Sequence, residues 1–158
     1  MAIQLRPFPP GHAGVVSGWA RTVAEVRQWC SLPAAPVPPS QINAWAEEDW
    51  VRPFGLYRDE QLVGYGELWS DDDEPGVELA RLIVDPAERG QGLGQRLTIE
   101  LAGRARSLRP LVFLRVVPDN IAARRCYAAA GFAPATDAQA AEWNTGQPRE
   151  YVWLTLAS

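Results

Sequence analysis

The feature that most constrains this chain is the stretch from Glu78 to Gly94, which reads E-L-A-R-L-I-V-D-P-A-E-R-G-Q-G-L-G. Its first half is a mostly apolar strand that breaks at Asp85-Pro86, and its second half brings three glycines to the start of a helix. Glycines in such a turn let the backbone approach a ligand closely. The free N–H groups of the first helical turn and the helix dipole attract an anion. The stretch therefore predicts a phosphate-binding turn between a strand and a helix.

The rest of the chain alternates strand-like and helix-like patterns. Strands are predicted at residues 2–8, 54–58, 61–69, 78–84, 111–117 and 150–156. Helices are predicted at residues 12–30 in two pieces, 41–50, 92–108 and 121–130. Thr22 and Glu25 form a capping box, Ser40 is the expected cap of the next helix, and Leu108 is the last residue of an apolar helical stripe. Helices interleave with strands in the second half, which indicates an α/β fold with a mixed sheet.

The length of 158 residues fits a single domain, residues 1–158, that can bury a substantial core. No apolar run approaches the roughly 20 residues that span a bilayer, and the N-terminus lacks a signal-peptide pattern. We therefore expect a cytoplasmic protein that does not contact a membrane. Two distant cysteines, Cys30 and Cys126, are expected to be reduced, and with the single His12 they offer no metal-ligand cluster. No bound metal is expected.

The net charge of −4 conceals an uneven distribution. Residues 89–125 contain eight arginines and two acids, whereas the rest of the chain contains seven arginines and seventeen acids. Because the basic segment begins at the glycine-rich turn, the split favours an anion-binding surface there and a cation-attracting surface elsewhere. Chance clustering on a solvated face is the alternative. The overall negative charge argues against nucleic acid as a partner.

A second motif follows at residues 120–132, N-I-A-A-R-R-C-Y-A-A-A-G-F. Together with R-G-Q-G-L-G at residues 89–94, it resembles the acyl-CoA-binding core of the GNAT superfamily of N-acetyltransferases. The residues that match the two family patterns are Arg89, Gly92, Gly94, Asn120, Tyr127, Gly131 and Phe132. The resemblance implies a mixed, mostly antiparallel sheet of six to seven strands with flanking helices, splayed between the fourth and fifth strands. It also implies an acetyl-CoA-binding core at residues 78–132 and an acceptor-shaping half at residues 1–77.

The resemblance implies acetyl-CoA as the cosubstrate, with its pyrophosphate on the backbone N–H groups of the glycine-rich turn. Gly92 would permit close approach, Gly94 would permit close helix packing, and Arg89 would offset phosphate charge. Pantetheine would pair like an extra strand, and a strand N–H would polarise the thioester. Asn120 would bond the pantetheine or order the helix start. The residues implied to contact the cofactor are Leu82, Ile83, Val84, Arg89, Gly90, Gln91, Gly92, Leu93, Gly94, Gln95, Asn120 and Tyr127.

Acetylation of an amine requires removal of a proton from the amine and a proton donor for the leaving thiolate. Tyr127 occupies the family position that commonly donates this proton, and an aromatic core residue is the other interpretation. Glu78 resembles the family carboxylate that takes the amine proton, although it is also an ordinary polar residue at a strand start. Glu67, at the end of the preceding strand, is a second candidate. The family does not always use a fixed base.

The motifs imply transfer of an acetyl group from acetyl-CoA to a primary amine of a small molecule or peptide by direct attack. A non-catalytic acyl-CoA-binding sensor or scaffold with the same fold is the alternative. A Rossmann-like nucleotide site is disfavoured because the region about twenty residues beyond the glycines lacks an acidic residue. Acetyl and longer acyl donors, and a monomer and a homodimer, are all compatible with the sequence.

Two groups of residues allow alternative interpretations at the acceptor side. The acids of residues 71–74 are either solvated or steer a cationic amine acceptor. Four tryptophans of the N-terminal half either pack in the core or line an aromatic acceptor pocket, and they are Trp19, Trp29, Trp45 and Trp50.

Overall fold

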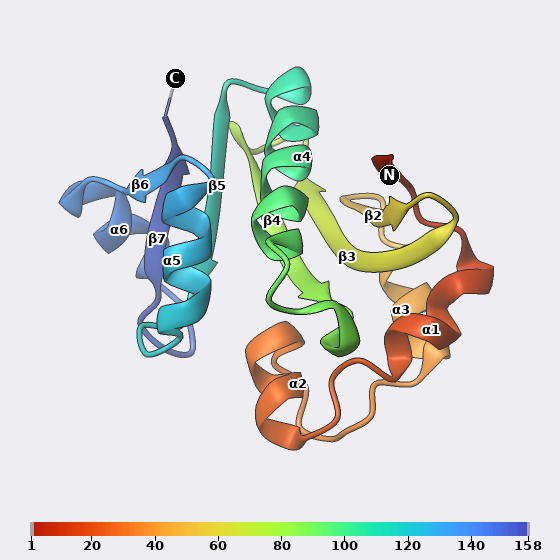
Figure 1. Ribbon diagram of the computed structural model, residues 1–158. Helices are drawn as coiled ribbons and strands as arrows, with labels where there is room; N and C mark the ends of the chain where they lie inside the picture. Colours follow the sequence, from red (N-terminus) through yellow and green to blue (C-terminus); the bar gives the residue numbers. More distant parts are fainter. Residues whose placement is uncertain (1, 158) are drawn as a thin grey trace.

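The computed structural model of the protein describes residues 2–157 (Figure 1). Over these residues it forms a seven-stranded sheet with the order β1-β2-β3-β4-β5-β7-β6. The strands are β1 (Ile3–Pro7), β2 (Val51–Arg58), β3 (Gln61–Ser70), β4 (Gly76–Val84), β5 (Leu111–Val116), β6 (Phe132–Pro134) and β7 (Val152–Leu156). The β4–β5 pair is parallel, and the other pairs are antiparallel. The α/β class and the mixed, mostly antiparallel sheet are therefore confirmed.

Helices cover both faces of this sheet. They are α1 (Ala13–Ser17), α2 (Val23–Cys30), α3 (Pro39–Trp45), α4 (Leu93–Leu108), α5 (Ile121–Ala129) and α6 (Asp137–Asn144). Figure 1 shows α4 and α5 side by side on one face, where α4 packs on β3, β4 and β5. Neighbouring residues of β2, Leu56 and Tyr57, belong to different buried clusters because alternate strand residues point to opposite faces. The cluster of Tyr57 packs beneath α1, α2 and α3 and includes Trp19, Trp29 and Trp45.

The two parallel strands pair over only three residues. Their register runs from Gly76 opposite Leu111 to Glu78 opposite Phe113, whereas β4 continues to Val84. The pairing of β3 with β4 shifts register where β4 reaches Arg81, and Arg81 has a left-handed φ of 51°. A bulge of this kind bends a strand and frees some of its backbone groups. The strands therefore diverge beyond Glu78, which confirms the predicted splay.

Some local predictions are wrong. Helix α3 begins at Pro39 and has no side-chain cap, so Ser40 lies inside it instead of capping it. Proline fits the first helical position because its missing N–H would be unpaired there anyway. The helix ends at Trp45 instead of continuing to residue 50. Leu108 is 41% exposed because it is the final residue of α4, while the earlier members of the stripe are buried.

The structure also contains a helix that the sequence patterns did not predict. Helix α6 begins with a capping box. The Thr136 hydroxyl accepts a hydrogen bond from the backbone N–H of Gln139, and the Gln139 side chain accepts one from the backbone N–H of Thr136. This T-x-x-Q pattern is the signal that could have located it. The predicted capping box of Thr22 and Glu25 is confirmed at the start of α2.

Over residues 2–157, no helix is both long enough and apolar enough to cross a bilayer. The same residues contain no group of three or more His, Cys, Asp or Glu side chains placed to hold a metal ion.

Candidate active site

A cavity of about 450 Å³ lies where β4 leaves β5, beside the N-termini of α4 and α5. We call it the first cavity. The splay of the strands opens one wall, and the glycine-rich turn forms another. All but two of the residues predicted to contact the cofactor line it, namely Leu82, Ile83, Val84, Arg89, Gly90, Gly92, Leu93, Gly94, Asn120 and Tyr127. The two motifs, which are separated in sequence, are therefore brought to one site.

Gln91 and Gln95 are the two predicted residues outside the lining of the first cavity. The Gln91 side chain donates to Glu88 at 3.0 Å and accepts from Arg58 at 3.2 Å. The Gln95 side chain donates to the Ala129 carbonyl at 3.4 Å. Both amides therefore bind other parts of the protein.

The glycine-rich turn presents backbone donors to the first cavity. Gly90 and Gly92 have left-handed φ values of 83° and 77°, which glycine adopts at little cost. Gly92 is the N-cap of α4, and its helix start has no side-chain cap, so the first N–H groups of α4 remain available to an anion. A methyl group at Gly94 would meet the Cys126 sulfur at 3.5 Å, an ordinary contact, so helix packing alone does not demand glycine there.

Tyr127 and Asn120 contribute the α5 side of the first cavity. Burial raises the pKa of the Tyr127 hydroxyl well above its ordinary value, so it stays protonated at neutral pH. Asn120 is the N-cap of α5, and its Oδ1 accepts from the Ala123 backbone at 3.3 Å. Of the two roles implied for Asn120, the structure therefore shows the ordering of the helix start.

A second cavity, of about 250 Å³, adjoins the first. The two cavities share wall residues from α2, β4 and α5, namely Gln28, Trp29, Leu82, Asn120 and Tyr127. The second cavity continues along β4 and β5 to Glu78 and Arg115. A molecule in each cavity would therefore meet the other between Leu82 and Tyr127.

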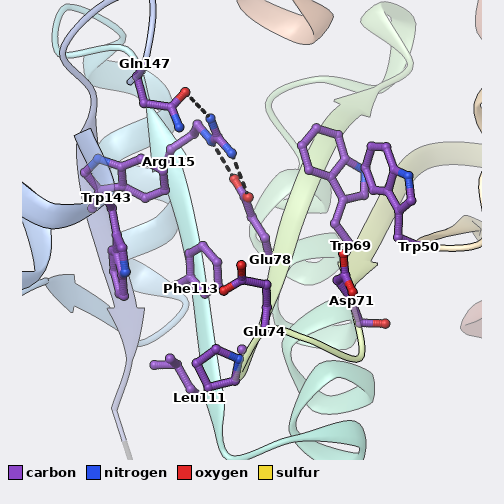
Figure 2. Close-up of a pocket in the computed structure, with 14 residues that line it drawn as sticks. Trp50, Trp69, Asp71, Glu74, Glu78, Leu111, Phe113, Arg115, Trp143 and Gln147 are labelled. Carbon is purple, nitrogen blue, oxygen red and sulfur yellow. Dashed lines mark hydrogen bonds and ion pairs between the residues drawn. The ribbon is translucent and has the colours of Figure 1, made fainter. Parts of the chain in front are cut away.

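Glu78 is the predicted carboxylate that faces the second cavity, and it is 6% exposed. Arg115 of β5 binds it with two hydrogen bonds, of 2.7 Å from Nε and 2.9 Å from Nη2 (Figure 2). Gln147 accepts a third hydrogen bond from Arg115 at 2.9 Å. Although burial lowers the pKa of Arg115, the hydrogen bonds and charge of Glu78 outweigh burial and raise that pKa. The pair therefore holds the carboxylate in one orientation at the cavity wall.

The chain matches the family model described as "Acetyltransferase (GNAT) family" over residues 20–132. It belongs to the GNAT acetyltransferase family. Mycothiol acetyltransferase of Mycobacterium leprae (strain Br4923) is 35% identical over 109 residues. That match covers 59% of this chain and 35% of the relative, so the chain spans only about a third of the length of that protein.

Solved structures of similar fold are related to this GNAT protein at low sequence identity. Aminoglycoside acetyltransferase AAC(6')-Ib, solved with coenzyme A and kanamycin, superposes with a TM-score of 0.74 at 20% identity, covering 99% of this chain and 95% of that one. Spermidine N-acetyltransferase of Vibrio cholerae, solved with CoA and spermine, gives 0.71 at 16% identity, covering 97% and 92%. These likenesses show the same fold.

Glu67, the second candidate base of this GNAT protein, has no exposed surface. Its carboxylate accepts hydrogen bonds from the Tyr65 hydroxyl, from Trp69 Nε1 at 2.8 Å and from Arg81 Nη1 at 2.8 Å. Trp69 and Arg81 line the second cavity, and Glu67 lies behind them. Burial, reinforced by the Glu67 charge, raises the pKa of Tyr65 well above its ordinary value. These contacts favour a structural role for Glu67.

The sequence reasoning missed Arg81 and Arg115, the two arginines that bind these carboxylates. The Arg81 guanidinium lies 4.0 Å from the Trp45 ring centroid and 4.8 Å from that of Trp69. The Arg81 carbonyl accepts from Trp29 Nε1 at 2.8 Å. Arg81 therefore ties the bulge of β4 to α2 and α3. A charged residue inside an apolar strand is the sequence signal for such a buried partner.

Replacement of Glu67 by glutamine tests its structural role. We expect Glu67→Gln to lower the free energy of unfolding by about 2 kcal/mol, because the hydrogen bond from partly buried Arg81 loses its charge assistance. Denaturant unfolding measures the change. The folded variant should keep most of its turnover, and a loss of turnover without a loss of stability would instead make Glu67 a base.

Proposed function

We propose that this GNAT protein transfers the acetyl group of acetyl-CoA to a primary amine of a small molecule or peptide by direct attack. The observation that carries the proposal is the shared wall of the first and second cavities. Acetyl-CoA occupies the first cavity, the amine enters the second, and the reacting atoms meet between Leu82 and Tyr127. No covalent enzyme intermediate is needed in this arrangement.

The first cavity offers each part of acetyl-CoA a suitable environment. The pyrophosphate binds the N–H groups of the α4 start, where the helix dipole adds to the attraction. Arg89, 50% exposed at its side chain, can turn from its 3.7 Å contact with Glu25 toward the phosphates. Pantetheine pairs with the part of β4 that β5 leaves unpaired, near Leu82 to Val84.

The residues that line the first and second cavities can account for each bond and each proton of the acetyl transfer. The neutral amine attacks the thioester carbon, and a β4 N–H stabilises the oxyanion. The C–N bond forms, the C–S bond breaks, Tyr127 donates its proton to the leaving sulfur, and the proton that the attacking nitrogen loses as it becomes an amide returns to Tyr127. Before the attack, the ammonium passes one proton to Glu78 through intervening water molecules, because Glu78 lies about 13 Å along the strand from Leu82 and both of its oxygens already accept from Arg115.

The relatives support an acceptor that is a small amine. Two of the similar structures are named for aminoglycoside and spermidine acetylation, and both names denote amine-bearing, cationic molecules. In this chain the second cavity contains Glu78, and acidic residues 71–74 lie at the turn before β4. We therefore favour a small cationic amine.

An amine panel tests the proposal. Purified protein is mixed with acetyl-CoA and with amino acids, polyamines, aminoglycosides or peptide N-termini, and release of the CoA thiol is followed. We expect release with at least one class, and calorimetry should show CoA binding. Strong CoA binding without release on any acceptor would instead support the non-catalytic sensor or scaffold, and absence of CoA binding would overturn both.

The role of Glu78 is open to a separate test. We expect Glu78→Gln to lower kcat/KM by about 10- to 100-fold at neutral pH, because the amine then loses its proton acceptor. The deficit should shrink as the pH approaches the amine pKa of about 8 to 10, since less ammonium then needs deprotonation. Glu100→Gln, on α4 and paired with Arg96 at 3.5 Å, is the matched control. A deficit that stays constant with pH would make Glu78 a positioning residue for Arg115.

A further inference from the structure

A third cavity, of about 360 Å³, lies beside the paired ends of β4 and β5, and we call it the aromatic cavity (Figure 2). On one wall the Trp50 and Trp69 rings meet edge to face, with centroids 5.2 Å apart. On the opposite wall Phe113 stacks on Trp143 at 5.0 Å, and Trp143 meets Trp153 at 5.5 Å. Trp50 is 37% exposed, although burial of a tryptophan is favourable. Two aromatic walls therefore face an unfilled space.

One carboxylate points into this space. Figure 2 shows the Glu74 side chain directed between Phe113 and Glu78. Asp71 also lines the cavity. Glu74 and Asp71 are both exposed residues of the turn that precedes β4. A cation placed here would meet ring faces and a carboxylate together, and both attract it.

Three arginines lie near the aromatic cavity, and each is paired with a carboxylate. Two of them already lie over its rings, since the Arg81 guanidinium is 4.8 Å from the Trp69 ring centroid and that of Arg115 is 4.8 Å from the Trp153 ring centroid. Arg115 lines it but is neutralised by its two hydrogen bonds with Glu78. Arg109 lies 3.6 Å from the Asp72 carboxylate and donates to the main-chain carbonyls of Asp71 and Glu74. The charge at the cavity is therefore negative, and it comes from Glu74 and Asp71.

The aromatic cavity adjoins the second cavity. Trp69, Glu78 and Arg115 line both. Glu78 and Leu82 are four residues apart on β4, which corresponds to about 13 Å along a strand. A molecule whose amine reacts near Leu82 could therefore extend past Glu78 into the aromatic cavity.

We propose that the aromatic cavity binds a second cationic group of the amine acceptor. This inference rests on the proposed acetyl transfer, and it adds that the preferred acceptor is a long diamine or polyamine rather than a monoamine. The aromatic rings of the two walls enclose the distal cation, and Glu74 pairs with it. A neutral aromatic group would use the rings but would gain nothing from Glu74.

The test compares α,ω-diamines with n-alkylamines of equal chain length, from diaminopropane and propylamine to diaminododecane and dodecylamine, because the two nitrogens must lie more than about 13 Å apart to reach past Glu78. We expect kcat/KM for the longer diamines to exceed that of the matched monoamines by about tenfold or more, since one cation–π contact and one ion pair together contribute that much. The shortest diamine should show no advantage because it cannot reach from Leu82 past Glu78.

Two variants assign the preference to the cavity. Glu74→Gln and Trp50→Leu should each reduce the ratio of diamine to monoamine kcat/KM severalfold. Asp73→Asn removes a charge from the same turn but lies outside the cavity lining, so it should keep the ratio. Equal kcat/KM for diamines and monoamines, or a ratio unchanged in Glu74→Gln, would overturn the proposal.

A binding measurement separates this proposal from the proposed acetyl transfer. Diaminododecane is titrated into the CoA-loaded protein, and tryptophan fluorescence is followed. We expect saturable quenching that weakens in Glu74→Gln and that dodecylamine does not reproduce. Such quenching without thiol release would retain the cation site and reject acetyl transfer to diamines. Thiol release from other amines without selective quenching by diaminododecane would retain the transferase and reject the cation site.

Discussion

Gly92→Asp is expected to weaken CoA binding by at least about 100-fold. A carboxylate at the N-cap of α4 would face the pyrophosphate, and two unit charges about 4 Å apart repel by about 4 kcal/mol at the effective dielectric of a protein surface. Gly92 lies in the wall of the first cavity, with a left-handed φ of 77°. Calorimetric titration with CoA measures the loss.

Two matched variants separate charge from backbone strain. Asparagine and aspartate both tolerate left-handed φ, so Gly92→Asn has nearly the same shape and strain as Gly92→Asp without its charge. Gly92→Asn should weaken binding only severalfold. Gly103→Asp places the same charge on an exposed site of α4, where an added Cβ meets nothing within 4 Å, and it should bind CoA normally. Equal losses in Gly92→Asn and Gly92→Asp would reject the pyrophosphate position.

Most residues that line the first cavity could be predicted from the sequence because they lie in short segments with recognisable patterns. The turn at residues 89–94 needs glycine for its left-handed backbone, and the helix that follows needs no long-range contact to expose its N–H groups. The Asn120 cap and Tyr127 lie within the same two turns of α5. The two motifs, read through their resemblance to the GNAT superfamily, therefore located all but two of the predicted cofactor residues at this cavity wall.

The partners of the two carboxylates were not predictable in this way. Arg115 reaches Glu78 across 37 residues of sequence, and the contact depends on the short parallel register of β4 and β5. Glu67 meets Arg81 only because β4 bulges there. A periodic pattern shows which face of a strand is buried, but it does not show which side chain of another strand lies beside it.

The aromatic cavity could not be predicted from the sequence either, because its lining residues come from several distant elements. Trp50 precedes β2, Trp69 lies on β3, Phe113 on β5 and Trp143 on α6, the helix that the sequence patterns missed. Of the N-terminal tryptophans, Trp50 is exposed at this cavity, whereas Trp19, Trp29 and Trp45 are buried. Burial and cavity lining do not exclude each other, because buried Trp29 also lines the first and second cavities, and only the packed structure shows which tryptophans line a cavity.

Tyr127→Phe is expected to lower kcat by about 100-fold with little change in CoA affinity. Phenylalanine keeps the ring that lines both cavities but removes the proton that the leaving thiolate requires. General acid catalysis contributes about 10²- to 10⁴-fold in enzymes, so the loss should lie in the chemical step. Single-turnover acetyl transfer at saturating amine measures that step, and calorimetry measures CoA affinity.

The pH profile gives an independent readout for Tyr127. An acid works only while protonated, and burial raises the pKa of Tyr127, so its active form persists as pH rises. The wild-type rate should therefore climb as the amine deprotonates, with no decline caused by Tyr127 below about pH 10. Tyr57→Phe removes a hydroxyl that bonds His12 at 2.6 Å outside the cavities, and it should leave turnover intact. Wild-type turnover in Tyr127→Phe would assign the sulfur proton to water and leave Tyr127 as a wall of the cavity alone.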